Sequence, residues 1–183
     1  KTVQAIAVMA DRAVAGATHF LVVCPASVLV GWQREVATHS RLVAHRLHGE
    51  GREAAVERWR AEGGVGITTY EGLEHVAAPA DDGALGLLVV DEAHYVKNPR
   101  AQRTRLVAAW AARTWRVLLM TGTPMHNRLE EFLELVRMLQ PTLVDAVPRH
   151  VGLAGPDAFR RAVAPVYLRR NQVDVLVELP ELV

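Results

Sequence analysis

The sequence has few cysteines and aromatic residues and almost no net charge. Cys24 is the single cysteine, which excludes an intrachain disulfide and favours a small buried hydrophobic role for that side chain. Lysine and arginine number 21 against 20 aspartates and glutamates, a formal net charge of +1. Any contact with nucleic acid must therefore come from a local patch of the surface.

Long apolar runs and a secretory signal are also missing. The apolar runs are too short to cross a bilayer, and the first residues, KTVQAIAVMA, lack a basic region followed by a long apolar one. We therefore expect a cytoplasmic protein, associated with the nucleoid in a bacterium or nuclear in a eukaryote. The first residue is not methionine, which suggests an excised segment. The eight histidines show no zinc-ligand spacing.

Half of the residues are hydrophobic and the length of 183 residues fits one domain. Short apolar runs predict buried strands, and longer amphipathic segments predict helices. Strands are expected within 19–25, 43–49, 65–70, 84–94 and 115–124, and helices within 3–14, 27–38, 52–61, 101–113 and 128–139; residues 141–157 are expected to be less regular. This alternation predicts an α/β fold with three layers, a mostly parallel sheet covered by helices on both faces.

Ligands of such sheets bind beyond the carboxyl ends of the strands. The polar motifs of this sequence all follow predicted strands: Pro25–Ser27, Thr69–Tyr70, Asp91–His94 and Thr121–Thr123. Their shared position predicts one functional edge of the sheet.

The adjacent acids Asp91 and Glu92 end an apolar strand. One carboxylate can hold Mg²⁺, and the other can orient or deprotonate an attacking water, as metal-assisted phosphoryl transfer requires. An acidic turn with a helix N-cap at Asp91 is the alternative interpretation.

Two further motifs are weak when taken alone. Lys1-Thr2 leads directly into a predicted helix, as the end of a phosphate-binding loop does. Thr121-Gly122-Thr123 places two hydroxyls at a strand end, where they could sense a neighbouring group or simply form a turn.

Several segments, in this order, resemble the signatures of the Swi/Snf-type branch of the superfamily II helicase-like ATPases. They are LVVCPASVLVGWQREV, ITTYEGL, VVDEAHYVKNP, LLMTGTPMHNRLEEF and YLRRNQVDVLVELP. The DEAH box and the TGTP turn mark the superfamily, and the extensions KNP, HNRLEE and LRR mark the branch. The resemblance covers nearly the whole chain.

The resemblance implies the first RecA-like P-loop NTPase lobe, spanning residues 1–183 and beginning inside the phosphate-binding loop. It implies that Lys1 binds the phosphates of ATP, that Thr2 and Asp91 bind Mg²⁺, and that Glu92 activates water. His94 and the turn of Thr121, Gly122 and Thr123 would couple the nucleotide state to DNA engagement or lobe closure.

The resemblance also implies two elements that contact a DNA backbone. Pro25, Ala26 and Ser27, with the following helix, match the first, and Thr68, Thr69 and Tyr70 match the second. Ordinary capping is an equal alternative for Ser27 or Thr69 taken alone.

The tryptophans and one run of basic residues each allow a structural and a functional interpretation. Trp32 could stack on a base, but a core position is favoured for Trp32, Trp59 and Trp110. Six basic residues and no acid lie between Lys97 and Arg116. They could face phosphates, dock a second lobe, or form a solvated helix face.

The function that the resemblance implies is ATP-driven translocation along double-stranded DNA. ATP, Mg²⁺, duplex DNA and a second ATPase lobe would be the partners, and the second lobe, with the arginine that completes the site, lies outside this sequence. We therefore expect the chain alone to hydrolyse ATP negligibly. A strand-separating DEAH-box helicase for RNA or DNA, and a degenerate docking module without activity, are the alternatives.

Overall fold

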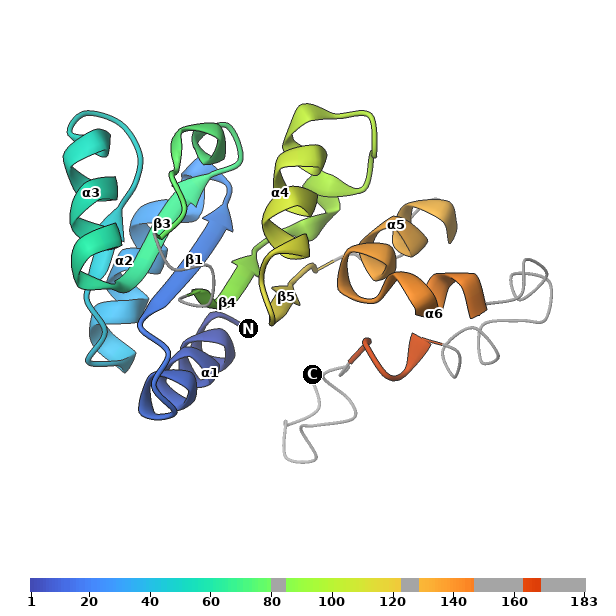
Figure 1. Ribbon diagram of the computed structural model, residues 1–183, viewed down its shortest axis with the longest axis horizontal. Helices are drawn as coiled ribbons and strands as arrows, with labels where there is room; N and C mark the ends of the chain where they lie inside the picture. Colours follow the sequence, from blue (N-terminus) through green and yellow to red (C-terminus); the bar gives the residue numbers. More distant parts are fainter. Residues whose placement is uncertain (80–84, 123–128, 147–162, 169–183) are drawn as a thin grey trace, which may run out of the picture.

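The computed structural model describes residues 1–79, 85–122, 129–146 and 163–168. In this part of the chain five parallel strands form one sheet in the order β2-β3-β1-β4-β5 (Figure 1). The strands are β1 (His19–Cys24), β2 (Ala44–Arg46), β3 (Gly64–Thr69), β4 (Leu85–Val90) and β5 (Val117–Leu119). Because β1 pairs with both β3 and β4, segments from three parts of the sequence meet at the centre of the sheet.

Helices cover both faces of the sheet. Side chains of α1 (Thr2–Val14) and α2 (Leu29–His39) pack on one face. Side chains of α3 (Arg52–Glu62) and α4 (Gln102–Ala112) pack on the other. Beyond β5, α5 (Leu129–Leu139) packs against α6 (Pro141–Ala146) (Figure 1).

Strand β1 shows why the chain forms two apolar layers. Successive side chains of a strand point to opposite faces. Accordingly, Phe20, Val22 and Cys24 join the core beneath α1 and α2, whereas Leu21 and Val23 join the core beneath α3 and α4. A strand buried on both faces needs a continuous apolar run, which the sequence supplies.

The expected three-layer α/β architecture and the five expected strands and helices are therefore confirmed, with shorter β2 and β5 than the sequence suggested. The expectation of a less regular stretch was wrong at its start, because α6 begins at Pro141. Proline is tolerated in the first turn of a helix, where its missing N–H would have no helical partner. Within the described residues, no helix is both long enough and apolar enough to span a membrane.

Three short 3₁₀ turns leave the carboxyl edge of the sheet. They are η1 (Ala26–Val28) after β1, η2 (Gly72–His75) after β3 and η3 (Ala93–Val96) after β4. The register aligns Cys24 with Thr69, Val23 with Val90, and Val90 with Leu119. The polar motifs predicted from the sequence therefore lie side by side at one edge.

Candidate active site

The acidic pair sits at the carboxyl end of β4, between two neighbouring strands. The backbone N–H of Asp91 donates to the carbonyl of Val23 at 2.8 Å, and that of Ala93 donates to the carbonyl of Met120 at 2.8 Å. Main-chain bonds to β1 on one side and to the end of β5 on the other thus fix the backbone on both sides of Glu92.

Glu92 has a strained backbone. Its φ of 51° is the one positive value at a non-glycine position in the described ranges, and its ψ of 51° places it in the left-handed region. Such a conformation costs about 1–3 kcal/mol and persists only where the surroundings impose it, most often at functional sites. The strain singles out Glu92 among the acids that the structure describes.

The Asp91 carboxylate is held by two donors. Its Oδ1 accepts the N–H of Glu92 at 2.9 Å, and its Oδ2 accepts the indole Nε1–H of Trp32 at 2.9 Å. Each carboxylate oxygen can accept a further bond, so the group keeps capacity for a cation or a water. The N-cap of η3 is Glu92 rather than Asp91, and it makes no side-chain cap bond, which leaves the capping alternative without support.

The Glu92 side chain is partly exposed and lies beside His94. Glu92 Oε2 is 3.1 Å from His94 Nδ1, within ion-pair distance when the imidazole is protonated but outside hydrogen-bonding geometry. The His94 ring tilts against Tyr95, with ring centroids 4.7 Å apart. The Glu92 carboxylate is thus positioned by packed neighbours and remains open to solvent water.

Lys1 and Gly122 lie close together although they are far apart in sequence. A methyl group built on Gly122 would lie 3.8 Å from Lys1 Nζ. Lys1 is the N-cap of α1, so the positive end of that helix faces the same edge. Thr121 and Thr2 are half-buried, and Thr123 lies outside the described residues.

These groups form a chemically consistent set. An ammonium and a helix N-terminus suit phosphate oxygens, and carboxylate and hydroxyl oxygens are the ligands that Mg²⁺ prefers. The residues present therefore fit a magnesium nucleotide: Lys1 for its phosphates, and Thr2 and Asp91 for its cation.

The two predicted DNA-contacting elements differ in exposure. Ala26 and Ser27 are exposed and Pro25 is half-buried, so the start of η1 is open to a partner. Thr69 is 1% exposed, and its Oγ1 accepts the N–H of Gly72 at 3.0 Å, so its hydroxyl is used within the turn, whose N-cap is Glu71.

Tyr70 points inward as well. It is 2% exposed, and its hydroxyl donates to the carbonyl oxygen of Asp91 at 2.5 Å. Its ring stacks on Tyr95 with centroids 5.5 Å apart, and burial raises the pKa of its phenol. The side chains of Thr69 and Tyr70 thus have no surface at which they could touch a phosphate, and Tyr70 instead supports the acidic pair.

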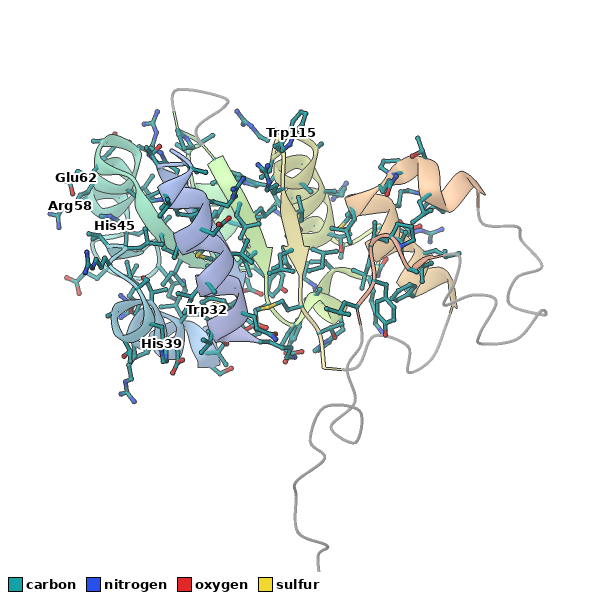
Figure 2. The ribbon with its side chains drawn as sticks, turned by 90° about the horizontal axis from the view of Figure 1, so that it is seen from below. Trp32, His39, His45, Arg58, Glu62 and Trp115 are labelled. Carbon is teal, nitrogen blue, oxygen red and sulfur yellow. The ribbon has the colours of Figure 1, made fainter. Side chains whose placement is uncertain are left out.

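Cys24 and three of the four tryptophans are buried, as expected, whereas Trp115 is exposed. Burial and the nearby Asp91 charge raise the pKa of Cys24 to about 12, which leaves no reactive thiolate at neutral pH. Trp32, Trp59 and Trp110 are all buried. Trp32 lies on the side of the sheet covered by α1 and α2 (Figure 2), so its burial excludes base stacking.

Sequence reasoning missed the second role of Trp32, the bond to Asp91. A buried indole N–H almost always needs an acceptor. A tryptophan on the apolar face of a helix, with no acceptor nearby in sequence, could therefore have indicated a bond from the Trp32 indole to a distant acceptor.

The basic run between Lys97 and Arg116 is spread along α4 and the residues on either side of it. Helix α4 is about 16 Å long, because 11 residues rise about 1.5 Å each, so Arg103 and Arg113 lie near opposite ends. Arg103 donates to the carbonyl of Tyr95 at 2.6 Å and lies over its ring, and Arg113 lies over the Trp110 ring. These contacts favour the solvated helix face.

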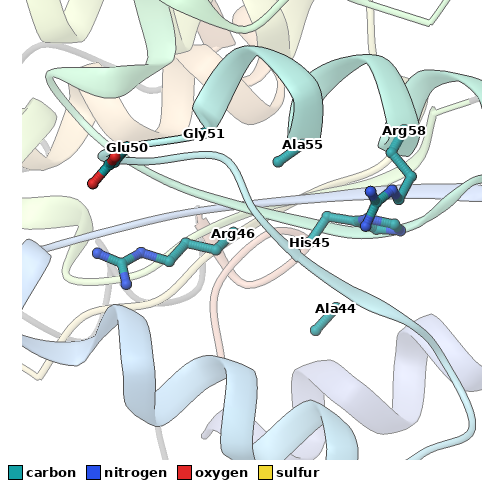
Figure 3. A pocket seen from close by; sticks show the side chains of 7 residues that line it. All are labelled: Ala44, His45, Arg46, Glu50, Gly51, Ala55 and Arg58. Carbon is teal, nitrogen blue, oxygen red and sulfur yellow. The ribbon is translucent and has the colours of Figure 1, made fainter.

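A hollow of about 450 Å³ lies between β2 and α3, separated from β4 by two strands. Figure 3 shows its lining, which consists of Ala44, His45, Arg46, Glu50, Gly51, Ala55 and Arg58. Burial is the main cause that lowers the pKa of His45 there. None of the motif residues lines this hollow, so it is separate from the candidate site.

Comparison with known proteins gives a consistent result. A family model described as "SNF2-related domain" matches residues 1–151. The mouse protein named chromodomain-helicase-DNA-binding protein 1-like is 33% identical over 177 residues, which cover 88% of this chain and 19% of that protein. The CHD3-type chromatin-remodeling factor CHR7 of Arabidopsis thaliana is 29% identical over 190 residues, covering 96% of this chain and 16% of that protein.

A solved structure shares the fold. It is the Sulfolobus solfataricus SWI2/SNF2 ATPase core in complex with dsDNA, and it matches with a TM-score of 0.75 and 25% identity over 98% of this chain and 40% of that one. The match confirms the RecA-like architecture expected from the sequence. The chain spans less than a fifth of the length of the two curated relatives.

Proposed function

The chain belongs to the SNF2-related family of helicase-like ATPases, and from this premise we propose that it is the first of two lobes of an ATP-driven translocase for double-stranded DNA. The observation that carries the proposal is the strained Asp91-Glu92 pair at the carboxyl end of β4, beside the edge where Lys1 meets Gly122. The similar Sulfolobus solfataricus ATPase core was solved in complex with dsDNA, which supports the choice of substrate.

The proposed chemistry divides roles among the edge residues. Lys1 and the N-terminus of α1 bind the phosphates, and Thr2 and Asp91 hold the cation. When bound, Mg²⁺ neutralises the charge that develops on the transferred phosphoryl group. Glu92 orients a water and takes its proton, for which its partly exposed carboxylate is suited.

Coupling residues surround this pair. We assign His94 to sensing the state of Glu92, because the two side chains are 3.1 Å apart. Gly122 lies near the Lys1 ammonium, where a change in the bound phosphates would act first, and we assign the coupling role to Thr121, Gly122 and Thr123 together. Their proposed role is to pass the nucleotide state to lobe closure.

DNA binding is proposed at the exposed start of η1. Pro25 and Ser27 precede α2, and the Ser27 hydroxyl and the first N–H groups of the helix suit phosphate oxygens. Contacts of this kind carry little sequence information, so we expect binding to depend on salt more than on base sequence. Thr69 and Tyr70 support this edge from inside.

The catalytic unit is proposed to include a second lobe. This chain covers 40% of the solved ATPase core that it matches. A second lobe would supply the arginine that stabilises phosphoryl transfer, a contribution worth orders of magnitude in rate. On this proposal the first lobe alone hydrolyses ATP negligibly.

Steady-state ATP hydrolysis by the intact protein, with and without duplex DNA, tests the proposal. We expect duplex DNA to stimulate hydrolysis and Glu92→Gln to lower the rate at least about 100-fold, because a positioned base contributes that much or more. Glu62→Gln, at the end of α3, is the matched control and should keep the wild-type rate. A rate of ATP hydrolysis that is unchanged in Glu92→Gln, or unchanged by duplex DNA, would contradict the proposal.

A further inference from the structure

Trp32 joins the proposed DNA-contacting helix to the proposed cation ligand. It is 2% exposed, lies one turn into α2, and donates its indole N–H to Asp91 Oδ2 at 2.9 Å, although 59 positions separate the two residues. A hydrogen bond from a neutral donor to a carboxylate is stronger than one between neutral groups. The bond therefore fixes how the Asp91 carboxylate is turned.

Trp32 also lies close to the exposed turn η1, which leads directly into its own helix α2. Leu29, Trp32 and Val36 lie three or four residues apart, on one buried face of α2. Ser27, five residues before Trp32, is exposed at the sheet edge. Ser27 lies in η1, which runs directly into α2 at Leu29, so a phosphate bound at Ser27 can shift the first turn of α2 and, through the Trp32 indole, the carboxylate.

A second connection reaches the same acid from the neighbouring strand. The Tyr70 hydroxyl donates to the backbone carbonyl of Asp91, so the main chain of this acid is held from β3 while its carboxylate is held from α2. Movement of α2 alone would therefore turn the Asp91 side chain on a fixed backbone.

We propose that Trp32 is a positioning residue that couples DNA binding at η1, directly before α2, to nucleotide binding, by orienting the Asp91 carboxylate. The inference rests on the proposed function. Because coupling between two sites is reciprocal, bound duplex must raise the affinity for nucleotide by the same factor as nucleotide raises the affinity for duplex. That coupling factor, rather than the rate of hydrolysis, is the quantity that Trp32 should control.

The test measures duplex affinity of the intact protein with and without saturating Mg²⁺ and a slowly hydrolysed ATP analogue. We expect a coupling factor of about tenfold in the wild type, typical of linked sites, and less than about twofold in Trp32→Phe. The affinity of Trp32→Phe for duplex without nucleotide should stay within about twofold of the wild-type value.

Trp59→Phe is the matched control. Trp59 is also buried and donates its indole N–H, in this case to the carbonyl of Gly64 at 3.2 Å, at a distance from the acidic pair. The variant Trp59→Phe loses the same ring atoms and the same kind of hydrogen bond as Trp32→Phe. Because the bond that it loses does not reach Asp91, this variant should keep the wild-type coupling factor. Equal loss of coupling in both variants would reduce Trp32 to a general packing role and overturn the inference.

A second variant guards against misfolding of Trp32→Phe. Benzothienylalanine at position 32 keeps the shape of the indole and lacks only the N–H, and it should lower the coupling factor as Trp32→Phe does. Fluorine NMR of the fluorotryptophan-labelled protein adds a spectroscopic readout: duplex without nucleotide should shift the Trp32 resonance and leave that of Trp59 in place.

The outcomes separate the two proposals. Wild-type coupling retained by a folded benzothienylalanine variant would overturn the role of Trp32 and leave the proposed function intact. A wild-type protein that binds neither duplex nor nucleotide would instead contradict the proposed function itself.

Discussion

The chain leaves β1 and β3 at adjacent points of one sheet edge, where Cys24 pairs with Thr69, and the two turns that follow differ in exposure. After β1, the start of η1 is exposed to solvent. After β3, Tyr70 and Leu73 enter the core, and the hydroxyl groups of Thr69 and Tyr70 point inward with them. A hydroxyl at a strand end therefore indicates a ligand contact only where the neighbouring side chains leave that hydroxyl exposed to solvent.

The largest measurable effect of this difference is the thiol reactivity of Cys24. This residue is the buried end of β1, and the exposed turn begins directly after it, at Pro25. With a pKa of about 12 in place of the ordinary 9.0, Cys24 should react with a thiol reagent at pH 8 about a thousandfold more slowly than an unperturbed thiol. Labelling of Cys24 in the native protein at the rate seen in urea would show that this end of β1 opens freely.

The next largest effect compares the space around Gly72, in the turn after β3, with the space around Gly31, in the helix that follows the other turn. A Cβ added at Gly72 would lie 2.6 Å from Thr68 Oγ1, whereas nothing lies within 4 Å of one added at Gly31 in α2. Gly72→Ala should therefore lower the free energy of unfolding by about 1–3 kcal/mol, the cost of overpacking. Urea unfolding followed by tryptophan fluorescence measures this change.

Gly31→Ala is the control for that prediction. Alanine is preferred over glycine inside a helix, so this variant should raise the free energy of unfolding by up to about 1 kcal/mol. If both variants changed stability in the same direction, the contrast between a crowded turn at Gly72 and an open helix position at Gly31 would be wrong.

The smallest effect tests DNA binding at the exposed turn. Ser27→Glu places a negative charge where a phosphate is proposed to bind, and it should weaken duplex binding about tenfold at low salt. Val14→Glu, at a 91% exposed position at the far end of α1, adds the same charge as a control. Equal affinities of the two variants would place the DNA elsewhere, and titration by fluorescence anisotropy decides between them.

The sequence by itself determined the layers of the molecule. Continuous apolar runs such as residues 19–24 specify strands buried on both faces, and helical spacing of apolar residues specifies the covering helices. It also located Asp91 and Glu92 correctly at a strand end, because the motif and the strand are contiguous. These features depend on neighbours within a few positions.

Only the tertiary structure decided which distant groups meet. The sheet order puts β1 between β3 and β4, and this order brings Trp32 and Tyr70 to Asp91 and sets Lys1 beside Gly122. It also decided that Thr69 is buried, with its hydroxyl bonded to Gly72, while Ser27 is exposed. Side-chain period and turn composition are local properties, whereas these contacts follow from strand order and register, which the packing of the whole core sets.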